Sequence, residues 1–152
     1  MAAGEESAHL GHYYANRRNR FWETLDEIDI TPTKFCPKDD KKLLKYGIGL
    51  TNLVQDEAGM NRDIKGLNQK DVLETRLHGI LIKYRPARIA FNGKGGNAVK
   101  HALGVKNLDW GLQPYHHAFP DTQIWVLPST SSANGRFNNL LHNWVKLAES
   151  MH

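Results

Sequence analysis

The sequence predicts an α/β domain with a mainly parallel central sheet. Short apolar runs of the kind that form buried strands alternate with longer segments whose apolar residues recur every three or four positions. No repeat, low-complexity tract or internal linker interrupts this alternation, and 152 residues are enough to bury one hydrophobic core. We therefore expect residues 1–152 to form a single domain.

A polar loop over residues 1–15 precedes the first predicted helix. Asn16 or Asn19 can cap this helix, because a side-chain oxygen accepts hydrogen bonds from the free amides of a first turn. The helix is expected to end at residues 31–33, where Thr-Pro-Thr breaks the pattern. Its apolar stripe comprises Phe21, Trp22, Leu25 and Ile28.

A second helix and a strand are predicted to follow. Pro37 suits the first turn of a helix, and Gly47 suits its end. Leu43 and Leu44 are both expected to point inward. The apolar run IGLTNLV, residues 48–54, is typical of a buried strand.

The most amphipathic helix is expected between Asn68 and Pro86. Asn68 followed by Asp71 resembles a capping arrangement, and Pro86 closes the segment. The residues expected to face inward are Val72, Leu73, Leu77, Ile80 and Leu81.

Two further strands and two helices complete the prediction. The strands are ARIAF (87–91) and QIWVLP (123–128), and a helix running to about Leu103 follows the first of them. The last helix follows the small-residue loop STSSANG. Its inward residues are predicted to be Phe137, Leu140, Leu141, Trp144, Val145 and Ala148.

Composition narrows the class of protein. The net charge is +4 and the pI about 9.2, which favours polyanionic partners, since Lys and Arg supply most non-specific affinity for nucleic acids. The apolar runs IWVLP and GILI are too short to span a membrane, and no secretory signal is evident. We expect a cytoplasmic, nucleoid-associated monomer. A single cysteine, Cys36, excludes an internal disulfide and a cysteine-based zinc site.

Polar segments follow each of the three predicted strands, where the ligands of an open parallel sheet bind. These segments are Thr51-Asn52, Asn92-Gly93-Lys94 and Ser129–Arg136. The last, STSSANGR, offers amides and hydroxyls to an anion such as phosphate, although a helix cap by Ser132 or Asn134 explains the same residues. FNGKGG lacks the spacing of a nucleotide-binding loop and is read as a strand-to-helix turn.

The opening loop combines aromatic rings with guanidinium groups. Tyr13 and Tyr14 are followed by Asn-Arg-Arg-Asn-Arg, which suits a protein that stacks on an unpaired base and grips the adjoining phosphates. A solvated, basic helix start with one buried tyrosine accounts for the pattern equally well. His116 and His117 are adjacent and lack a carboxylate at a ligand-like interval, so we expect no metal site and no cofactor.

Four segments together resemble one protein family. GHYYANRRNRFWETL, GIGLTNLV, FNGK and IWVLPSTSSANGRF occur in the order and spacing of the mismatch-specific uracil/thymine DNA glycosylases, within the uracil-DNA glycosylase superfamily, over roughly residues 1–148. The resemblance implies a three-layer α/β/α sandwich. It also implies a cofactor-free hydrolase of base excision repair that flips uracil, thymine or a deaminated purine out of double-stranded DNA and cleaves its N-glycosidic bond.

The resemblance also assigns roles to individual residues. Tyr14 matches the aromatic residue that stacks on the flipped base, and Asn52 matches the side chain that reaches its polar edge. Ser129 and Ser131 are implied to lie at the base. The residues implied to hold the DNA are Ser132, Ala133, Asn134, Arg136, Arg17, Arg18 and Lys94.

The first family motif is where this sequence departs from the pattern. The family's Gly-Ile-Asn-Pro-Gly uses its asparagine to position the hydrolytic water, and counting back from Tyr14 places Ala2 there. Alanine cannot orient water. We expect either that His9 or Glu5 takes this role (Glu6, Ser7 and Asn16 being further candidates) or that the chain is a catalytically weak or inactive module binding mismatches or abasic sites.

The strand that should precede that motif is also missing from the sequence. We expect either that Met1 is an internal methionine of a longer reading frame or that the sheet is rearranged. A third and more distant interpretation is an unrelated α/β enzyme that binds nucleotides.

Overall fold

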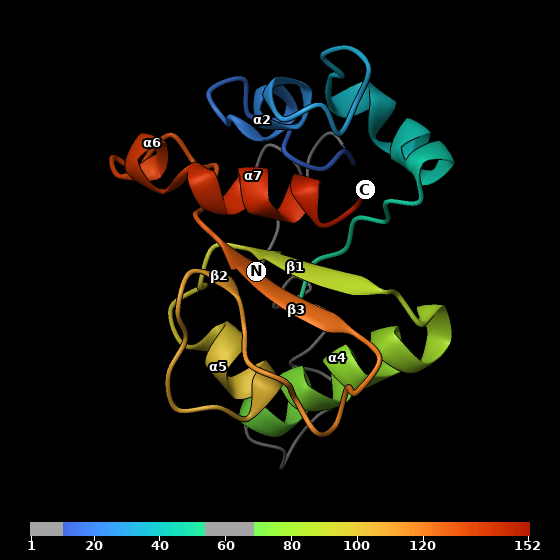
Figure 1. Ribbon diagram of the computed structural model, residues 1–152, viewed down its shortest axis with the longest axis vertical. Coiled ribbons are helices and arrows are strands. Elements are labelled where there is room, and N and C mark those ends of the chain that lie inside the picture. Colours follow the sequence, from blue (N-terminus) through green and yellow to red (C-terminus); the bar gives the residue numbers. More distant parts are fainter. Residues whose placement is uncertain (1–10, 54–68) are drawn as a thin grey trace.

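Helices lie on both sides of a small central sheet in the computed structural model, which describes residues 11–53 and 69–152 (Figure 1). The elements, in chain order, are α2 (Phe21–Glu27), the 3₁₀ helix η1 (Pro37–Tyr46), α4 (Gln69–Tyr84), β1 (Arg88–Asn92), α5 (Ala98–Leu103), β2 (Gly111–Leu112), β3 (Gln123–Leu127), α6 (Phe137–Leu140) and α7 (His142–Glu149).

The sheet that the described residues form has three strands in the order β1-β3-β2. β1 and β3 run parallel, with Arg88 opposite Gln123 and Asn92 opposite Leu127, whereas the two-residue β2 pairs antiparallel with β3. The strands predicted at 87–91 and 123–128 are confirmed to within one residue at each end. The larger, mainly parallel sheet and the three-layer sandwich stay predictions.

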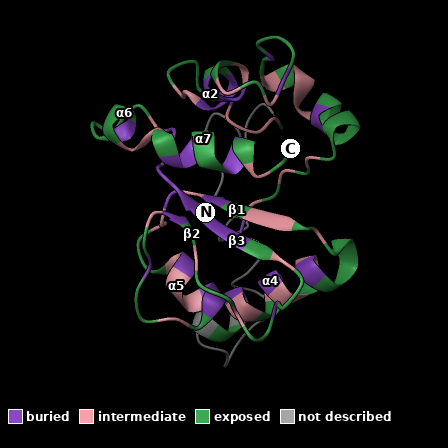
Figure 2. Ribbon diagram, viewed as in Figure 1, coloured by how far each residue is buried: buried purple, intermediate pink, exposed green. Residues whose placement is uncertain are grey.

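Side chains of β3 alternate between two hydrophobic clusters, because successive residues of a strand point to opposite faces. Ile124 and Val126 belong to the cluster formed with α4 and α5, hereafter the α4–α5 cluster. Trp125 and Leu127 belong to the cluster formed with α2, η1 and α7, hereafter the α2–α7 cluster. In Figure 2 the buried residues run along β3 and recur on the helices of both sides.

The helices predicted at the start, middle and end of the chain are present. Phe21, Trp22 and Leu25 of α2 are buried as predicted, although the helix ends earlier, at Glu27. Leu73, Leu77 and Leu81 form the buried face of α4. The predicted C-terminal helix is divided into α6 and α7, where Phe137, Trp144 and Ala148 are buried; Val145, predicted inward, is exposed, and Leu147 is buried instead.

The predicted strand over residues 48–54 is wrong: residues 48–53 form no strand, and residue 54 lies outside the described part. Ile48 and Leu50 pack on the α2–α7 cluster, whereas Leu53 belongs to the α4–α5 cluster. The carbonyl of Asn52 accepts a hydrogen bond from Nε of Arg76 at 3.0 Å. The run is apolar because it contributes to both clusters, a burial pattern that hydrophobicity alone cannot distinguish from that of a buried strand.

The predicted inward orientation of Leu44 is also wrong. Leu43 is fully buried, but 67% of Leu44 is exposed. The reason is the 3₁₀ geometry of η1: with three residues per turn, only about one residue in three faces the core, so adjacent leucines diverge. Gly47 ends the helix as predicted, in the left-handed conformation at φ 71°.

Asp39 secures the start of η1. Its carboxylate accepts a hydrogen bond from the Lys42 side chain at 2.7 Å and another from the backbone amide of Cys36 at 3.0 Å. These contacts lower the pKa of Asp39 from 3.8 to about 2, and the hydrogen bond with Lys42 has the largest effect. The carboxylate therefore stays ionised at pH values where an ordinary aspartate takes up its proton.

Replacing the two adjacent leucines of η1 tests this geometry. We expect Leu43→Ala to lower the free energy of unfolding by about 2–5 kcal/mol, because it leaves a cavity in the α2–α7 cluster. Leu44→Ala is the matched control and should change stability by less than about 0.5 kcal/mol. Urea denaturation measures both, and equal losses would contradict the burial of Leu43 and the exposure of Leu44.

Candidate nucleic-acid interface

Three segments that are distant in the sequence meet at the carboxyl ends of β1 and β3. They are the loop over residues 11–20, Asn92 at the end of β1, and the loop Ser129–Arg136 that follows β3. Hydrogen bonds join all three: Asn92 bonds to Thr130, and the backbone amide of Arg20 donates to the carbonyl of Thr130 at 2.9 Å. The predicted convergence of polar residues at this sheet edge therefore holds for two of the three strand-end segments.

Thr130 is the residue through which these segments are joined, and it is fully buried. Its backbone amide donates to Oδ1 of Asn92 at 2.9 Å, and its hydroxyl accepts from Nδ2 of Asn92 at 2.8 Å. The same hydroxyl donates to Oδ1 of Asn19 at 2.7 Å, and that oxygen also accepts from the amide of Phe21 at 3.0 Å. The predicted cap at Asn16 or Asn19 is wrong, because Arg20 is the capping residue of α2 and no side chain caps the helix. Asn19 instead accepts from the first amide of the helix and from the β3 loop.

Arg20 joins the same two loops through its side chain. One guanidinium nitrogen donates to the carbonyls of Ser131 at 3.2 Å and Asn134 at 3.4 Å. The guanidinium carbon lies 5.1 Å from the ring centroid of Phe137, within reach of a cation–π interaction. By contrast, Arg17 and Arg18 are exposed to solvent. Two arginines of the Asn-Arg-Arg-Asn-Arg run are therefore exposed to solvent, whereas the third, Arg20, holds the two loops together.

Tyr14 is held between α2 and the end of β1. Its ring stacks on Phe21 with centroids 3.9 Å apart, and its hydroxyl bonds to the Asn92 side chain. Burial raises the pKa of this hydroxyl, and the hydrogen bond with Asn92 opposes the rise only in part, so the tyrosine is neutral at physiological pH. The backbone is left-handed at φ 52°, which for a non-glycine residue needs support from such contacts.

The loop Ser129–Arg136 satisfies much of its own backbone. Ser129 Oγ accepts from the amide of Ser131, and Ser131 Oγ accepts from the amide of Ala133, each at 3.3 Å. The Asn134 side chain donates to the Ser129 carbonyl at 2.9 Å and accepts from the amide of Arg136 at 3.2 Å. These contacts are turns within the loop and not a helix cap, because the capping residue of α6 is Arg136 and no side chain caps this helix. The four-residue α6 is also too short to create an anion site. The side chains of Ser132, Ala133 and Arg136 in this loop are exposed.

Two residues assigned to ligand binding are engaged elsewhere. Nζ of Lys94 donates to the Leu108 carbonyl at 2.5 Å and lies 4.5 Å from the ring centroid of Trp110. Asn52 is half-buried, and its backbone carbonyl accepts a hydrogen bond from Arg76 of α4. Within the described segments, no hydrogen bond joins Asn52 to Tyr14 or Asn92. Neither residue therefore belongs to the junction at the strand ends.

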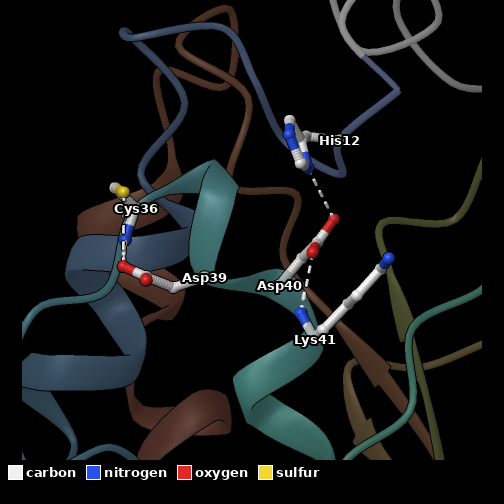
Figure 3. Close-up of polar contacts among 5 residues, drawn as sticks. All are labelled: His12, Cys36, Asp39, Asp40 and Lys41. Atoms are coloured by element: carbon white, nitrogen blue, oxygen red, sulfur yellow. Dashed lines mark hydrogen bonds and ion pairs between the residues drawn. The ribbon is translucent and has the colours of Figure 1, made fainter.

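Glu5 and His9, nominated to bind water, and Ala2, at the position of the family's asparagine, all precede residue 11 and lie outside the described residues. Asn16, a further candidate, is exposed, and its Oδ1 accepts from the amide of Arg18 at 2.9 Å. A histidine that sequence reasoning missed is placed by the structure. His12 contacts Asp40 of η1, its Nδ1 lying 3.1 Å from Oδ2, and the second oxygen of Asp40 accepts from the amide of Lys41 at 2.7 Å (Figure 3). No sequence signal identifies this pair, because 28 positions separate its members.

A comparison with known protein families finds no family model that matches the chain. Family membership therefore stays a prediction of the resemblance. In residues 11–53 and 69–152, no group of three or more histidine, cysteine, aspartate or glutamate side chains could hold a metal ion. Over the same residues, the helices are too short or too polar to cross a membrane.

Removing the Thr130 hydroxyl tests its role as the junction. Thr130→Val preserves shape but leaves the Asn19 and Asn92 side chains each short of one partner, so we expect a loss of about 1–3 kcal/mol in the free energy of unfolding. Ser132→Ala, in the same loop but exposed, is the control and should be nearly neutral. Urea denaturation measures the difference, and a Thr130→Val protein as stable as wild type would refute this role.

Proposed function

We propose that this protein is a monofunctional DNA glycosylase that flips uracil or a mismatched base out of double-stranded DNA and hydrolyses its N-glycosidic bond, acting as a monomer at the nucleoid. The observation that carries the proposal is the position of Tyr14. Its aromatic ring is fixed beside the Asn92 amide, at the meeting point of two loops that also bear exposed arginines.

The fixed ring suits a flipped base. Stacking of a base on an aromatic side chain is worth about 1–3 kcal/mol and is more favourable when the ring is already ordered. Phe21 supports Tyr14 from one side, and Asn92 holds its hydroxyl. Ser129 and Ser131, both half-buried in the adjacent loop, are the polar groups proposed to meet the base.

Exposed cations on both loops suit the DNA backbone. Arg17 and Arg18 precede α2, Arg136 closes the β3 loop, and the Arg20 contacts hold these loops together. Guanidinium groups pair well with phosphates, and such contacts position a protein on DNA without reading its sequence. The same loop would approach the duplex through Ser132, Ala133 and Asn134. The small side chain of Ala133 would enter the space that the flipped base leaves between its neighbours.

A single-turnover assay tests the proposal. With enzyme in excess over a duplex that contains uracil opposite guanine, we expect alkali-labile sites to form, because hydrolysis leaves an abasic sugar. A duplex of the same sequence with a thymine–adenine pair at that position is the control and should stay intact. Absence of strand breaks would overturn the enzymatic proposal, and salt-dependent binding that persisted would instead indicate a module that only binds DNA.

Two substitutions distinguish base stacking from phosphate binding. Tyr14→Ala should slow excision roughly 5- to 150-fold with a smaller loss of duplex affinity, since base stacking is lost. Arg136→Ala should weaken binding to every duplex and reduce the salt dependence by about one phosphate contact. Single-turnover rates and binding titrations at several salt concentrations measure both effects.

Matched variants control for structural damage. Tyr14→Phe keeps the ring on Phe21 and removes only the hydroxyl bonded to Asn92, so it should retain most of the excision rate. Lys106→Ala removes an equally exposed cation outside the two loops and should leave the salt dependence unchanged. Tyr14→Ala and Arg136→Ala behaving alike would count against both assignments.

A further inference from the structure

A histidine–aspartate pair adjoins the proposed base site. Nδ1 of His12 lies 3.1 Å from Oδ2 of Asp40, and the Asp40 side chain is only 9% exposed. His12 is two residues before Tyr14, so their Cα atoms are at most about 7 Å apart. The backbone of this histidine is therefore next to that of the proposed stacking residue.

Asp40 determines which ring nitrogen of His12 carries the proton. When Nδ1 of the neutral ring donates to this carboxylate, the lone pair of the imidazole is on Nε2. The second oxygen of Asp40 accepts from the amide of Lys41, which holds the carboxylate in place. In Figure 3 one edge of the imidazole meets Asp40, and the opposite edge points away from η1. A third of the His12 side chain is exposed, so water can reach it.

We propose that His12 binds and activates the hydrolytic water of this site and that Asp40 is its positioning residue; this inference rests on the glycosylase function proposed above. Nε2 takes a proton from water as the water oxygen bonds to C1′ of the flipped nucleotide. The C1′–N bond breaks, its electron pair leaves with the base, and the base anion takes a proton from solvent. Asp40 stabilises the imidazolium, which then releases its proton to solvent.

The alternative is that the pair only anchors the opening loop to η1. An anchor also needs the proton on Nδ1 but does not need a free Nε2, so the pH dependence of the chemical step separates the two roles. Charged or titratable groups beside His12 include Asp40 and Lys41 on η1 and Tyr13 and Tyr14 in its own loop. None of these four side chains ordinarily changes charge between pH 5 and 8, whereas a histidine does.

Single-turnover excision from the uracil-containing duplex, measured from pH 5 to 8, tests the proposal. We expect the wild-type rate to fall on acidification as one group takes up a proton. His12→Ala should be about 10²- to 10⁴-fold slower at neutral pH and should lose this dependence. Asp40→Asn should be slowed less, because the imidazolium that forms in the chemical step loses its negative partner.

Control variants come from the same elements. Asp39→Asn changes the neighbouring aspartate, which binds Cys36 and Lys42 and not His12, and should match wild type in rate and pH dependence near neutrality. His142→Ala, exposed on α7, should also match wild type. Each variant should bind a duplex with a tetrahydrofuran abasic-site analogue opposite guanine as tightly as wild type does, showing that DNA recognition is intact.

The outcomes separate failure of this inference from failure of the proposed function. Wild-type protein that excises no uracil overturns the function and this assignment together. Excision by wild type and His12→Ala at similar rates, or a slow variant with an unchanged pH dependence, overturns the assignment alone. Should His12→Ala not fold, ¹⁵N NMR of wild-type His12 decides: the proposal requires the proton on Nδ1, and a neutral ring protonated on Nε2 overturns it.

Discussion

The arrangement of the whole candidate site depends on one buried hydroxyl, that of Thr130. It accepts from Asn92 and donates to Asn19, so a single group satisfies a strand end and the entry to α2 at once. Buried polar groups are costly when unpaired, and a fully paired network therefore allows few alternative arrangements. Because 111 positions separate Asn19 from Thr130, this junction, together with the Arg20 contacts, brings the opening loop to the carboxyl ends of β1 and β3.

Residues of the same type have different roles around this junction. Arg20 is turned inward to two carbonyls and an aromatic ring, whereas Arg17 and Arg18 remain in solvent. The same division applies to the β3 loop, whose Ser129, Ser131 and Asn134 hold its backbone while Arg136 stays exposed. The contacts that build the loops thus leave only a few groups for a partner, and the proposed phosphate contacts are confined to those groups.

Binding and chemistry are assigned to different parts of the fold. Tyr14, Asn92 and the β3 loop lie at the strand ends, where an α/β sheet usually receives its ligands. His12 and Asp40 instead join the opening loop to η1, a helix whose start is secured by Asp39. A water-activating histidine placed in this way would compensate for the alanine at the position where the resembled family has an asparagine, without any change at the strand ends.

The sequence by itself determined the elements with regular periodicity, namely α2, α4, β1, β3 and the C-terminal helical region, and the candidate residues next to them. Periodicity reports which residues are buried, but not the geometry that buries them, so residues 48–53 were mistaken for strand and Leu44 for core. Only the tertiary structure decided that Lys94 faces Leu108 and Trp110, that Arg20 is structural and that His12 meets Asp40. These contacts join residues far apart in the chain, and the pairing of their donors and acceptors exists only after the segments have packed together.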